Sequence, residues 1–146
     1  MQNNIIIING PNINLLGDRD KSIYGNETYD NLLKRCKSEA IKKNINIDFY
    51  QSNIEGELVN FIQSIHDSLD SWVVINPGAF THTSIALRDA LNTLSAQNKI
   101  IEVHISNIEE REDYRKFNLI KEFCEISIIG EGIEGYFQAL DYINDK

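Results

Sequence analysis

Apolar residues along the chain follow two spacings, one typical of buried strands and the other of amphipathic helices. Short runs rich in β-branched residues predict five strands, at residues 4–9, 45–51, 72–75, 100–105 and 125–129. Between these runs, apolar residues recur at intervals of three and four, which indicates helices. Strands that alternate with helices predict βαβ units, and therefore a parallel sheet with helices on both faces.

Each predicted helix carries one apolar stripe. The first lies within residues 28–43, the second follows a capping-box pattern at Ser52 and Glu55, the third has Thr81 or Thr83 as its cap, and the last covers residues 133–143. The residues expected on the stripes are Tyr29, Leu33, Cys36 and Ala40; Leu58, Phe61, Ile62, Ile65 and Leu69; Ile85, Ala86, Ala90, Leu91 and Leu94; and Ile133, Phe137, Leu140 and Ile143.

Five such units in 146 residues predict one flavodoxin-like α/β domain over residues 1–146, with strand order 2-1-3-4-5. Ligands of such sheets bind beyond the carboxyl ends of the strands, beside strands 1 and 3. Polar residues do crowd the three segments expected there, Asn9–Gly17, Asn76–Ser84 and Glu102–Asn107. Two of the three histidines lie in these segments, so this edge of the sheet is the predicted functional site.

Composition and charge narrow the classes of partner. Hydrophobic residues make up 42% of the chain and charged residues 25%, as in ordinary globular proteins. The formal net charge of −8 disfavours nucleic acid or an anionic membrane as the main partner. Apolar runs such as Trp72–Ile75 are far too short to span a bilayer.

Cysteine usage and the first residues of the chain predict a cytoplasmic protein. Met1–Asn4 lack the basic segment of a secretory signal. Cys36 and Cys124 form no CxxC pair, and one possible bridge is not a disulfide scaffold, so we expect free thiols that are buried or half-buried.

Several common chemistries lack their motifs. The first strand is not followed by a Gly-rich dinucleotide fingerprint, and the chain contains neither a P-loop nor a Gly-x-Ser-x-Gly nucleophile elbow. His82 and His104 can meet, but no His or Cys pair has metal-ligand spacing within one element. We therefore expect no metal.

Glu102 and His104 are two residues apart on a predicted strand, so their side chains share one face. A carboxylate beside an imidazole fixes its tautomer and favours its protonated form, which makes a competent general acid. Taken alone, the pair fits equally well a Glu102 that is exposed to solvent or paired with a lysine.

Arg19 and Tyr24 lie in a segment with glycine at both ends, Gly17–Gly25, which is typical of a mobile lid. A guanidinium close to a phenol favours the phenolate. A solvated loop with a tyrosine packed on the surface explains the same residues when they are taken alone.

Two further features suit an anion. The backbone N–H groups of Ile105 and Ser106, just past a strand end, can form an anion-binding nest. Arg111 and Arg115 are four residues apart, on one face of an expected helix, and can close over an anion or pair with acidic neighbours such as Glu112.

Taken together, these segments closely resemble type II 3-dehydroquinate dehydratase. The resemblance covers the chain from its first strand to about residue 117. It is carried by Asn9–Gly17, Ile23–Gly25, Gln51–Asn53, Glu55–Leu58, Ile75–Ala79, Thr81–Ser84, Ala86–Ala90, Glu102–Asn107, Arg111 and Arg115. It implies a flavodoxin-like subunit that assembles into a homododecamer, a tetramer of trimers. It also implies a lyase that converts 3-dehydroquinate to 3-dehydroshikimate in the shikimate pathway without cofactor or metal.

The resemblance assigns catalytic roles to five residues. Tyr24 is the implied base that removes the proton alpha to the ketone, and Arg19 keeps it ionised and stabilises the transition state. A water held by Asn12 is implied to stabilise the enolate. His104, oriented by Glu102, is implied to protonate the departing hydroxyl.

The resemblance also assigns substrate binding. The N–H groups of Ile105 and Ser106 are implied to hold the substrate carboxylate. Asn76, His82 and Arg115 are implied to bind the ring hydroxyls, and Asp89 to reach the site of a neighbouring subunit.

The chain departs from the family pattern in places. Phe80 stands where a tyrosine is common, and the residues after Arg115 differ from the usual segment. Asp18 and Asp20 flank Arg19, and two carboxylates there are expected to neutralise its charge in part. An alternative function is a flavodoxin-like anion-binding or signalling module without catalysis. A receiver module needs an acidic cluster after the first strand, where this chain has Asn9–Asn12.

Overall fold

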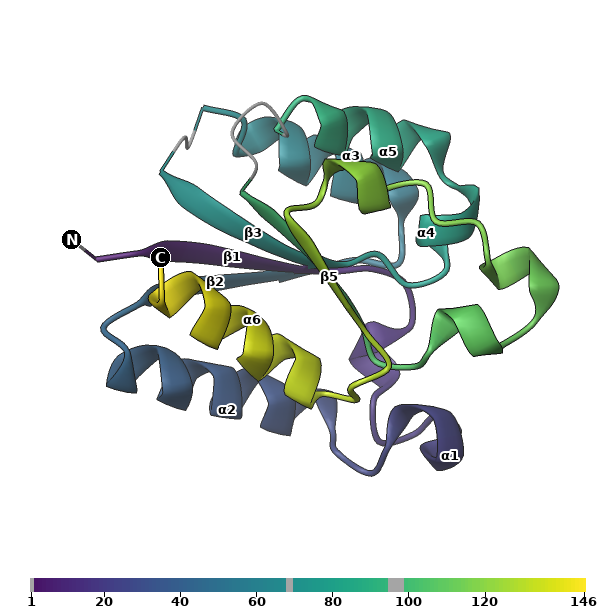
Figure 1. Cartoon of the computed structure of the whole chain (residues 1–146), viewed down its shortest axis with the longest axis horizontal. Coiled ribbons are helices and arrows are strands. Elements are labelled where there is room, and N and C mark those ends of the chain that lie inside the picture. Colours follow the sequence, from purple (N-terminus) through teal and green to yellow (C-terminus); the bar gives the residue numbers. More distant parts are fainter. Residues whose placement is uncertain (1, 68–69, 95–98) are drawn as a thin grey trace.

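The computed structural model of the chain describes residues 2–67, 70–94 and 99–146, and in that part five parallel strands form one sheet (Figure 1). The strands are β1 Asn4–Asn9, β2 Asn46–Gln51, β3 Ser71–Asn76, β4 Ile100–His104 and β5 Ile126–Ile129. Their order is β2-β1-β3-β4-β5, which confirms the predicted flavodoxin-like topology. Each strand lies within one or two residues of its predicted bounds.

Helices cover both faces of this sheet. α2 (Tyr29–Lys42) and α6 (Glu134–Asn144) lie on one face, and α3 (Glu55–Ser64) and α5 (Ile85–Asn92) on the other (Figure 1). Within β1, Ile5 and Ile7 join one apolar cluster and Ile6 and Ile8 the other. The strand reads as an unbroken apolar run because both of its faces are buried.

Several helix details differ from the prediction. Ser84, not Thr81 or Thr83, caps α5, because its hydroxyl accepts a hydrogen bond from the N–H of Leu87 at 2.8 Å. The prediction of a capping box at Ser52 and Glu55 is also wrong. The Ser52 hydroxyl accepts from the N–H of Ile54 and donates to Glu57, and the side chain of Ile54, which precedes α3, makes no capping bond.

The apolar stripes were mostly predicted correctly. In α2 Leu32 is buried rather than Leu33. In α5 Ile85 is 64% exposed and Ala86 is exposed as well, whereas Leu87, which was not predicted for the stripe, is buried. α3 ends at Ser64, and Leu69, which was predicted for its stripe, lies outside the described residues.

Short helical turns occupy the carboxyl edge of the sheet, on the right of Figure 1. After β1 come η1 (Ile13–Leu15) and α1 (Lys21–Tyr24), and after β3 comes α4 (Phe80–Thr83). After β4 come the 3-10 turns η3 (Ile108–Glu110) and η4 (Asp113–Arg115), whereas η5 (Lys121–Phe123) lies away from this edge, just before the start of β5. We expected one helix with Arg111 and Arg115 on the same face. In this described segment the residues form separate short turns instead, so that prediction is wrong.

Two glycines let the loops after β1 and β3 touch. A Cβ on Gly10 would lie 2.3 Å from the carbonyl oxygen of Pro77, and a Cβ on Gly78 would lie 2.9 Å from that of Pro11. Gly78 also has a φ of +59°, which side chains disfavour. The N–H of Gly10 donates to the carbonyl of Asn76 at 2.8 Å, and this bond joins the two loops that frame the predicted site.

Two properties of the chain concern its environment. Cys36 is a buried free thiol and Cys124 is a half-buried one, as expected. Among the described residues, the helices are all too short or too polar to span a membrane.

Candidate active site

A pocket of about 100 Å³ lies at the carboxyl ends of β1, β3 and β4. The predicted site residues that line it are Asn12, Arg19, Tyr24, Asn76, His82, His104, Ile105, Ser106 and Arg115. Arg111 lines it as well. The loops after three separate strands therefore bring together nearly all the side chains that the sequence singled out.

The Tyr24 hydroxyl accepts hydrogen bonds from two arginines. Arg19 Nη2 donates to it at 2.7 Å and Arg111 Nη1 at 2.9 Å. The guanidinium carbon of Arg19 also lies 3.7 Å from the centre of the Tyr24 ring. Two cations at a buried phenol stabilise the negative charge of a phenolate.

The local fold presents Tyr24 on a single helical turn. The Asp20 carboxylate caps α1 by accepting from the N–H and the hydroxyl of Ser22, at 3.0 Å and 2.6 Å. These bonds lower the pKa of Asp20, although its carboxyl is exposed. Asp20 was expected to draw charge from Arg19, but its carboxylate is engaged by Ser22 while Arg19 points to Tyr24.

His104 and Glu102 form a buried pair, and the prediction that they share one face is confirmed. His104 Nε2 lies 2.9 Å from Glu102 Oε2, and both side chains are almost inaccessible to solvent. Glu102 is therefore neither exposed nor paired with a lysine. Since Nε2 faces the carboxylate, Nδ1 is the ring nitrogen left to reach the pocket.

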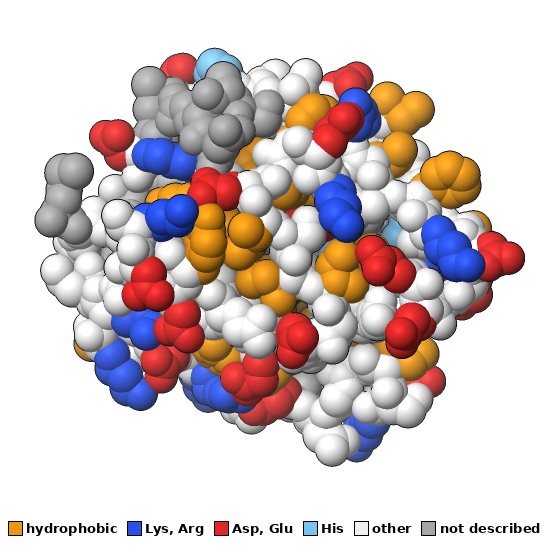
Figure 2. All heavy atoms as spheres, viewed as in Figure 1, with side chains coloured by type: hydrophobic (Ala, Val, Ile, Leu, Met, Phe, Trp, Pro, Cys, Tyr) orange, Lys and Arg blue, Asp and Glu red, His pale blue; other side chains and the backbone are white. Residues whose placement is uncertain are grey.

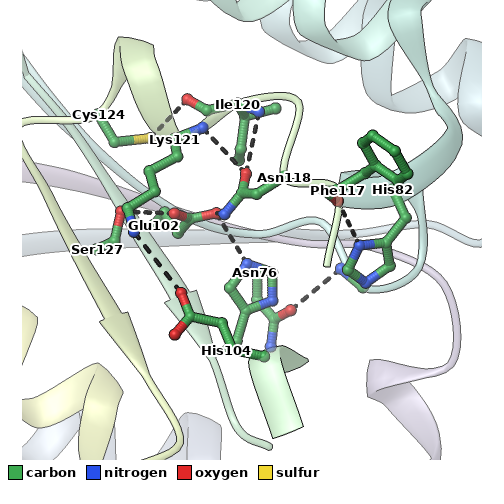
Figure 3. A network of polar contacts seen from close by, with 12 residues as sticks. Asn76, His82, Glu102, His104, Phe117, Asn118, Ile120, Lys121, Cys124 and Ser127 are labelled. Atoms are coloured by element: carbon green, nitrogen blue, oxygen red, sulfur yellow. Dashed lines mark hydrogen bonds and ion pairs between the residues drawn. The ribbon is translucent and has the colours of Figure 1, made fainter. Parts of the chain in front are cut away.

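Glu102 stays ionised although it is fully buried. Burial alone would raise the pKa of this carboxyl, but hydrogen bonds from His104, Ser127 and Asn118 outweigh it and leave the pKa below its ordinary value. Ser127 Oγ donates to Oε1 at 2.5 Å, and Asn118 Nδ2 donates to Oε2 at 2.7 Å (Figure 3).

His82 lies in the same pocket as a neutral imidazole. Burial lowers its pKa, and the nearby positive groups His104, Arg115 and Arg111 lower it further. Its Nδ1 lies 2.7 Å from the carbonyl oxygen of Phe117, which accepts, so Nδ1 carries the proton. Nε2 is then an acceptor, suited to a ligand hydroxyl.

Asn76 is held by a buried network. Its Nδ2 donates to the hydroxyl of Tyr136 at 3.0 Å, and that hydroxyl donates to Asn9 Oδ1 at 2.6 Å. Its Oδ1 accepts from the N–H of Gly78 at 3.1 Å. Each amide atom can make one more hydrogen bond, so the side chain can still bind a ligand in the pocket.

The chain matches the family Dehydroquinase class II over residues 3–144. A curated relative from Clostridium acetobutylicum, named 3-dehydroquinate dehydratase, is 47% identical over 93% of this chain and 92% of its own length. A type II dehydroquinase crystal structure from Butyrivibrio crossotus superimposes with a TM-score of 0.93 at 45% identity, covering 98% of each chain. The chain belongs to the class II dehydroquinase family.

A curated relative from Prochlorococcus marinus, also named 3-dehydroquinate dehydratase, is 48% identical over 98% of both chains. The family match extends to residue 144 and thus includes the segment after Arg115, where the resemblance was weakest. This segment includes Asn118, whose side chain donates a hydrogen bond to Glu102 behind the pocket.

Not every predicted residue reaches the pocket of this dehydroquinase subunit. Asp89 is exposed on α5 and is not among the pocket residues, and Glu102 lies behind His104. Arg115 lines the pocket, but its Nε also donates to Glu112 at 2.6 Å. The described residues contain no group of three or more His, Cys, Asp or Glu side chains placed to hold a metal ion.

Sequence reasoning missed three side chains. Arg111 was considered only as an anion ligand, whereas it donates to Tyr24, 87 residues earlier in the chain. Asn118 and Ser127, the two partners of Glu102, were not considered. The register could have indicated Ser127, because it lies opposite Glu102 in the parallel sheet. No spacing rule points to Arg111 or Asn118.

Proposed function

We propose that this chain is a hydro-lyase that dehydrates 3-dehydroquinate to 3-dehydroshikimate, a step of the shikimate pathway to aromatic amino acids. Membership of the class II dehydroquinase family supports this. The observation that carries the proposal is that one pocket is lined by a phenol held by two guanidiniums and by the imidazole of a buried Glu–His pair.

Tyr24 is the proposed base. As a phenolate stabilised by Arg19 and Arg111, it removes the proton alpha to the substrate ketone. The C–H electron pair moves into the ring and the carbonyl oxygen becomes an enolate oxygen.

That enolate oxygen needs a hydrogen-bond donor, since the charge develops there in the transition state. Asn12, which lines the pocket, is proposed to hold a donating water. Its backbone is fixed in the left-handed region, with a φ of 69°, and its N–H donates to Asn53 Oδ1 at 2.9 Å.

His104 is the proposed acid. With Nε2 bonded to Glu102, the protonated ring gives its Nδ1 proton to the departing hydroxyl. The enolate then collapses, the C–O bond breaks, and water leaves with the conjugated enone as product. Tyr24 ends as a neutral phenol and His104 as a neutral imidazole, and proton exchange with solvent restores both.

The remaining pocket residues are proposed to orient the substrate. The N–H groups of Ile105 and Ser106 hold its carboxylate, and His82 Nε2, Asn76 and Arg115 bind its hydroxyls. Such orientation supplies the part of the rate enhancement that acid and base groups do not.

We further propose that the working enzyme is a homo-oligomer, a tetramer of trimers in which Asp89 completes the site of a neighbouring subunit. Exposed apolar side chains support an assembly. Ile54 and Ile85 are 58% and 64% exposed, and Figure 2 shows apolar side chains between charges of both signs on one face of the molecule.

The non-catalytic alternative, an anion-binding module, explains the arginines but not the Glu102–His104 pair. Burying an imidazole and a carboxylate together is costly even when they are hydrogen-bonded to each other, and anion binding alone gives no reason for that cost. A simple anion site also has no use for a buried phenol in the same pocket.

Ultraviolet absorbance tests the proposed function, because the product is a conjugated enone and the substrate is not. We expect the native protein to generate this absorbance from 3-dehydroquinate, and Tyr24→Phe to lose about a hundred- to ten-thousand-fold in turnover, as is typical when a base is removed. Native protein without activity would contradict the function. Near-normal turnover by Tyr24→Phe would contradict the role of Tyr24.

A further inference from the structure

We infer that Asn118 and Ser127 are positioning residues for the acid, because their donors keep the shared proton on His104 rather than on Glu102. This inference rests on the proposed function. It concerns the step in which the departing hydroxyl is protonated, and neither residue lines the pocket or touches the substrate.

Three side chains are hydrogen-bonded to the Glu102 carboxylate. Oε2 accepts from His104 Nε2 at 2.9 Å and from Asn118 Nδ2 at 2.7 Å, and Oε1 accepts from Ser127 Oγ at 2.5 Å (Figure 3). A buried carboxylate without such donors gains a proton more readily, because burial disfavours its charge. The nearest proton would come from His104 Nε2, and the ring would then be a neutral, weaker acid.

The amide of Asn118 has one orientation only. Its Oδ1 accepts from the N–H groups of Ile120 and Lys121 at 3.1 Å and 3.0 Å, so its NH₂ group must face Glu102. Asn118 therefore does two separable things, since it caps the turn η5 through its oxygen and supports the acid through its nitrogen.

The segment that carries Asn118 is fixed on both sides. The carbonyl of Phe117 accepts from His82, the N–H of Leu119 donates to the carbonyl of Thr81 at 2.9 Å, and the carbonyl of Leu119 accepts from Arg88. Ser127 is fixed by strand register, because β5 places it opposite Glu102. The two donors thus come from elements that are themselves held in place.

Charged groups on the neighbouring elements influence how the protonation of the Glu102–His104 pair depends on pH. The titratable or charged groups on the elements around it include His82 on α4, Arg88 on α5, Arg111 and Arg115 after β4, and Cys124 before β5. Lys121 of η5 also lies beside the pair and forms an ion pair with Glu109 at 3.7 Å (Figure 3). Burial and the Glu102 charge raise the pKa of the Cys124 thiol, so it stays neutral. Arg88 is engaged by Leu119 and Glu122.

The decisive variant is Asn118→Asp, which keeps an oxygen for Ile120 and Lys121 but replaces the donor by a carboxylate oxygen facing Glu102. We expect kcat to fall about ten- to a hundred-fold at neutral pH, the typical cost of a hydrogen bond to a buried charge. As the pH falls, the introduced carboxyl gains a proton and becomes a donor again. The ratio of variant to native kcat should therefore rise towards low pH, with KM little changed.

A purely structural role for Asn118 gives a different result. The cap survives in Asn118→Asp, so a structural role predicts native kcat at every pH, and that result would overturn the inference. A uniform loss with a constant variant-to-native ratio would overturn it as well. Lys116→Ala is the matched control in the same segment. Its exposed side chain pairs with Asp113 at 3.0 Å and does not line the pocket, and we expect native kcat and the native pH profile.

Ser127→Ala keeps the inference testable if Asn118→Asp does not fold, which thermal unfolding would reveal. We expect this variant to fold and to lose several-fold to ten-fold in kcat, and unchanged kcat and pH profile would count against the inference.

Nitrogen NMR of the His104 imidazole separates failure of this inference from failure of the proposed function, because it needs no substrate. We expect a proton on Nε2 in the native protein and an altered titration of the ring in Asn118→Asp. Identical spectra would refute the positioning role even if the chain turned out to be no dehydratase.

Discussion

The Tyr24 hydroxyl accepts hydrogen bonds from one arginine in its own loop and from one in the segment after β4. Arg19 is five residues away in sequence and Arg111 is 87 residues away. Arg111 also donates to Ser106 Oγ at 3.2 Å, so it joins the base to the segment proposed to hold the substrate carboxylate. At the scale of single residues, Arg111 is therefore proposed to support the base together with Arg19.

This assignment predicts that Arg111→Ala lowers kcat by about ten- to a hundred-fold, because hydrogen bonds to charged groups contribute about 1.5–3 kcal/mol. The enone assay measures it. Arg35→Ala is the matched control, since Arg35 is a surface arginine that pairs with Glu27 and Glu134 and does not line the pocket. Equal rates for Arg111→Ala and native protein would contradict the role of Arg111.

Residues on one strand or in one loop were predictable from sequence, and residues that meet through long-range folding were not. Glu102 and His104 are two residues apart on a strand, which predicted that their side chains share one face. Their hydrogen bond confirms this prediction. The contact of Asn118 with Glu102 depends on the path of an irregular segment, and no periodicity encodes such a path.

At the scale of elements, strands were predicted more accurately than helix ends. Unbroken β-branched runs such as Ile5–Ile8 reflect burial on two faces, and this signal is strong. Helix starts depend on which hydroxyl is oriented towards a free N–H group, and neighbouring candidates such as Thr81, Thr83 and Ser84 look alike in sequence.

The segment between β4 and β5 shows more clearly that the bounds of helices are hard to predict from sequence. A helix was expected at Arg111 and Arg115, whereas the structure has the short turns η3, η4 and η5. Each turn ends after three residues, and their capping is local. Asn107 accepts from the N–H of Glu109, and Asn118 accepts from the N–H groups of Ile120 and Lys121 at the start of η5. Such side-chain bonds compete with helix formation.

At the scale of the whole molecule, we propose that the site is shared between the subunits of an oligomer. Asp89 lies on the exposed surface of α5 and does not line the pocket of its own chain. If it completes a neighbour's site, activity depends on assembly as well as on folding.

Mixing two inactive variants tests this division. We expect Tyr24→Phe and Asp89→Ala to be poorly active alone. After dissociation and joint reassembly, sites that combine Tyr24 of one variant with Asp89 of the other should regain activity. Each variant reassembled with itself is the control, and mixtures no more active than their parents would show that the site is not shared.

Deuterium exchange separates the role of the proposed base, Tyr24, from that of the proposed acid, His104, within one reaction. His104→Ala is incubated with 3-dehydroquinate in D₂O, and the recovered substrate is examined by NMR. The account predicts deuterium alpha to the ketone with little dehydration, because Tyr24 still forms the enolate while the hydroxyl cannot leave. It predicts neither exchange nor product with Tyr24→Phe. Exchange at the native rate in Tyr24→Phe, or none in His104→Ala, would contradict it.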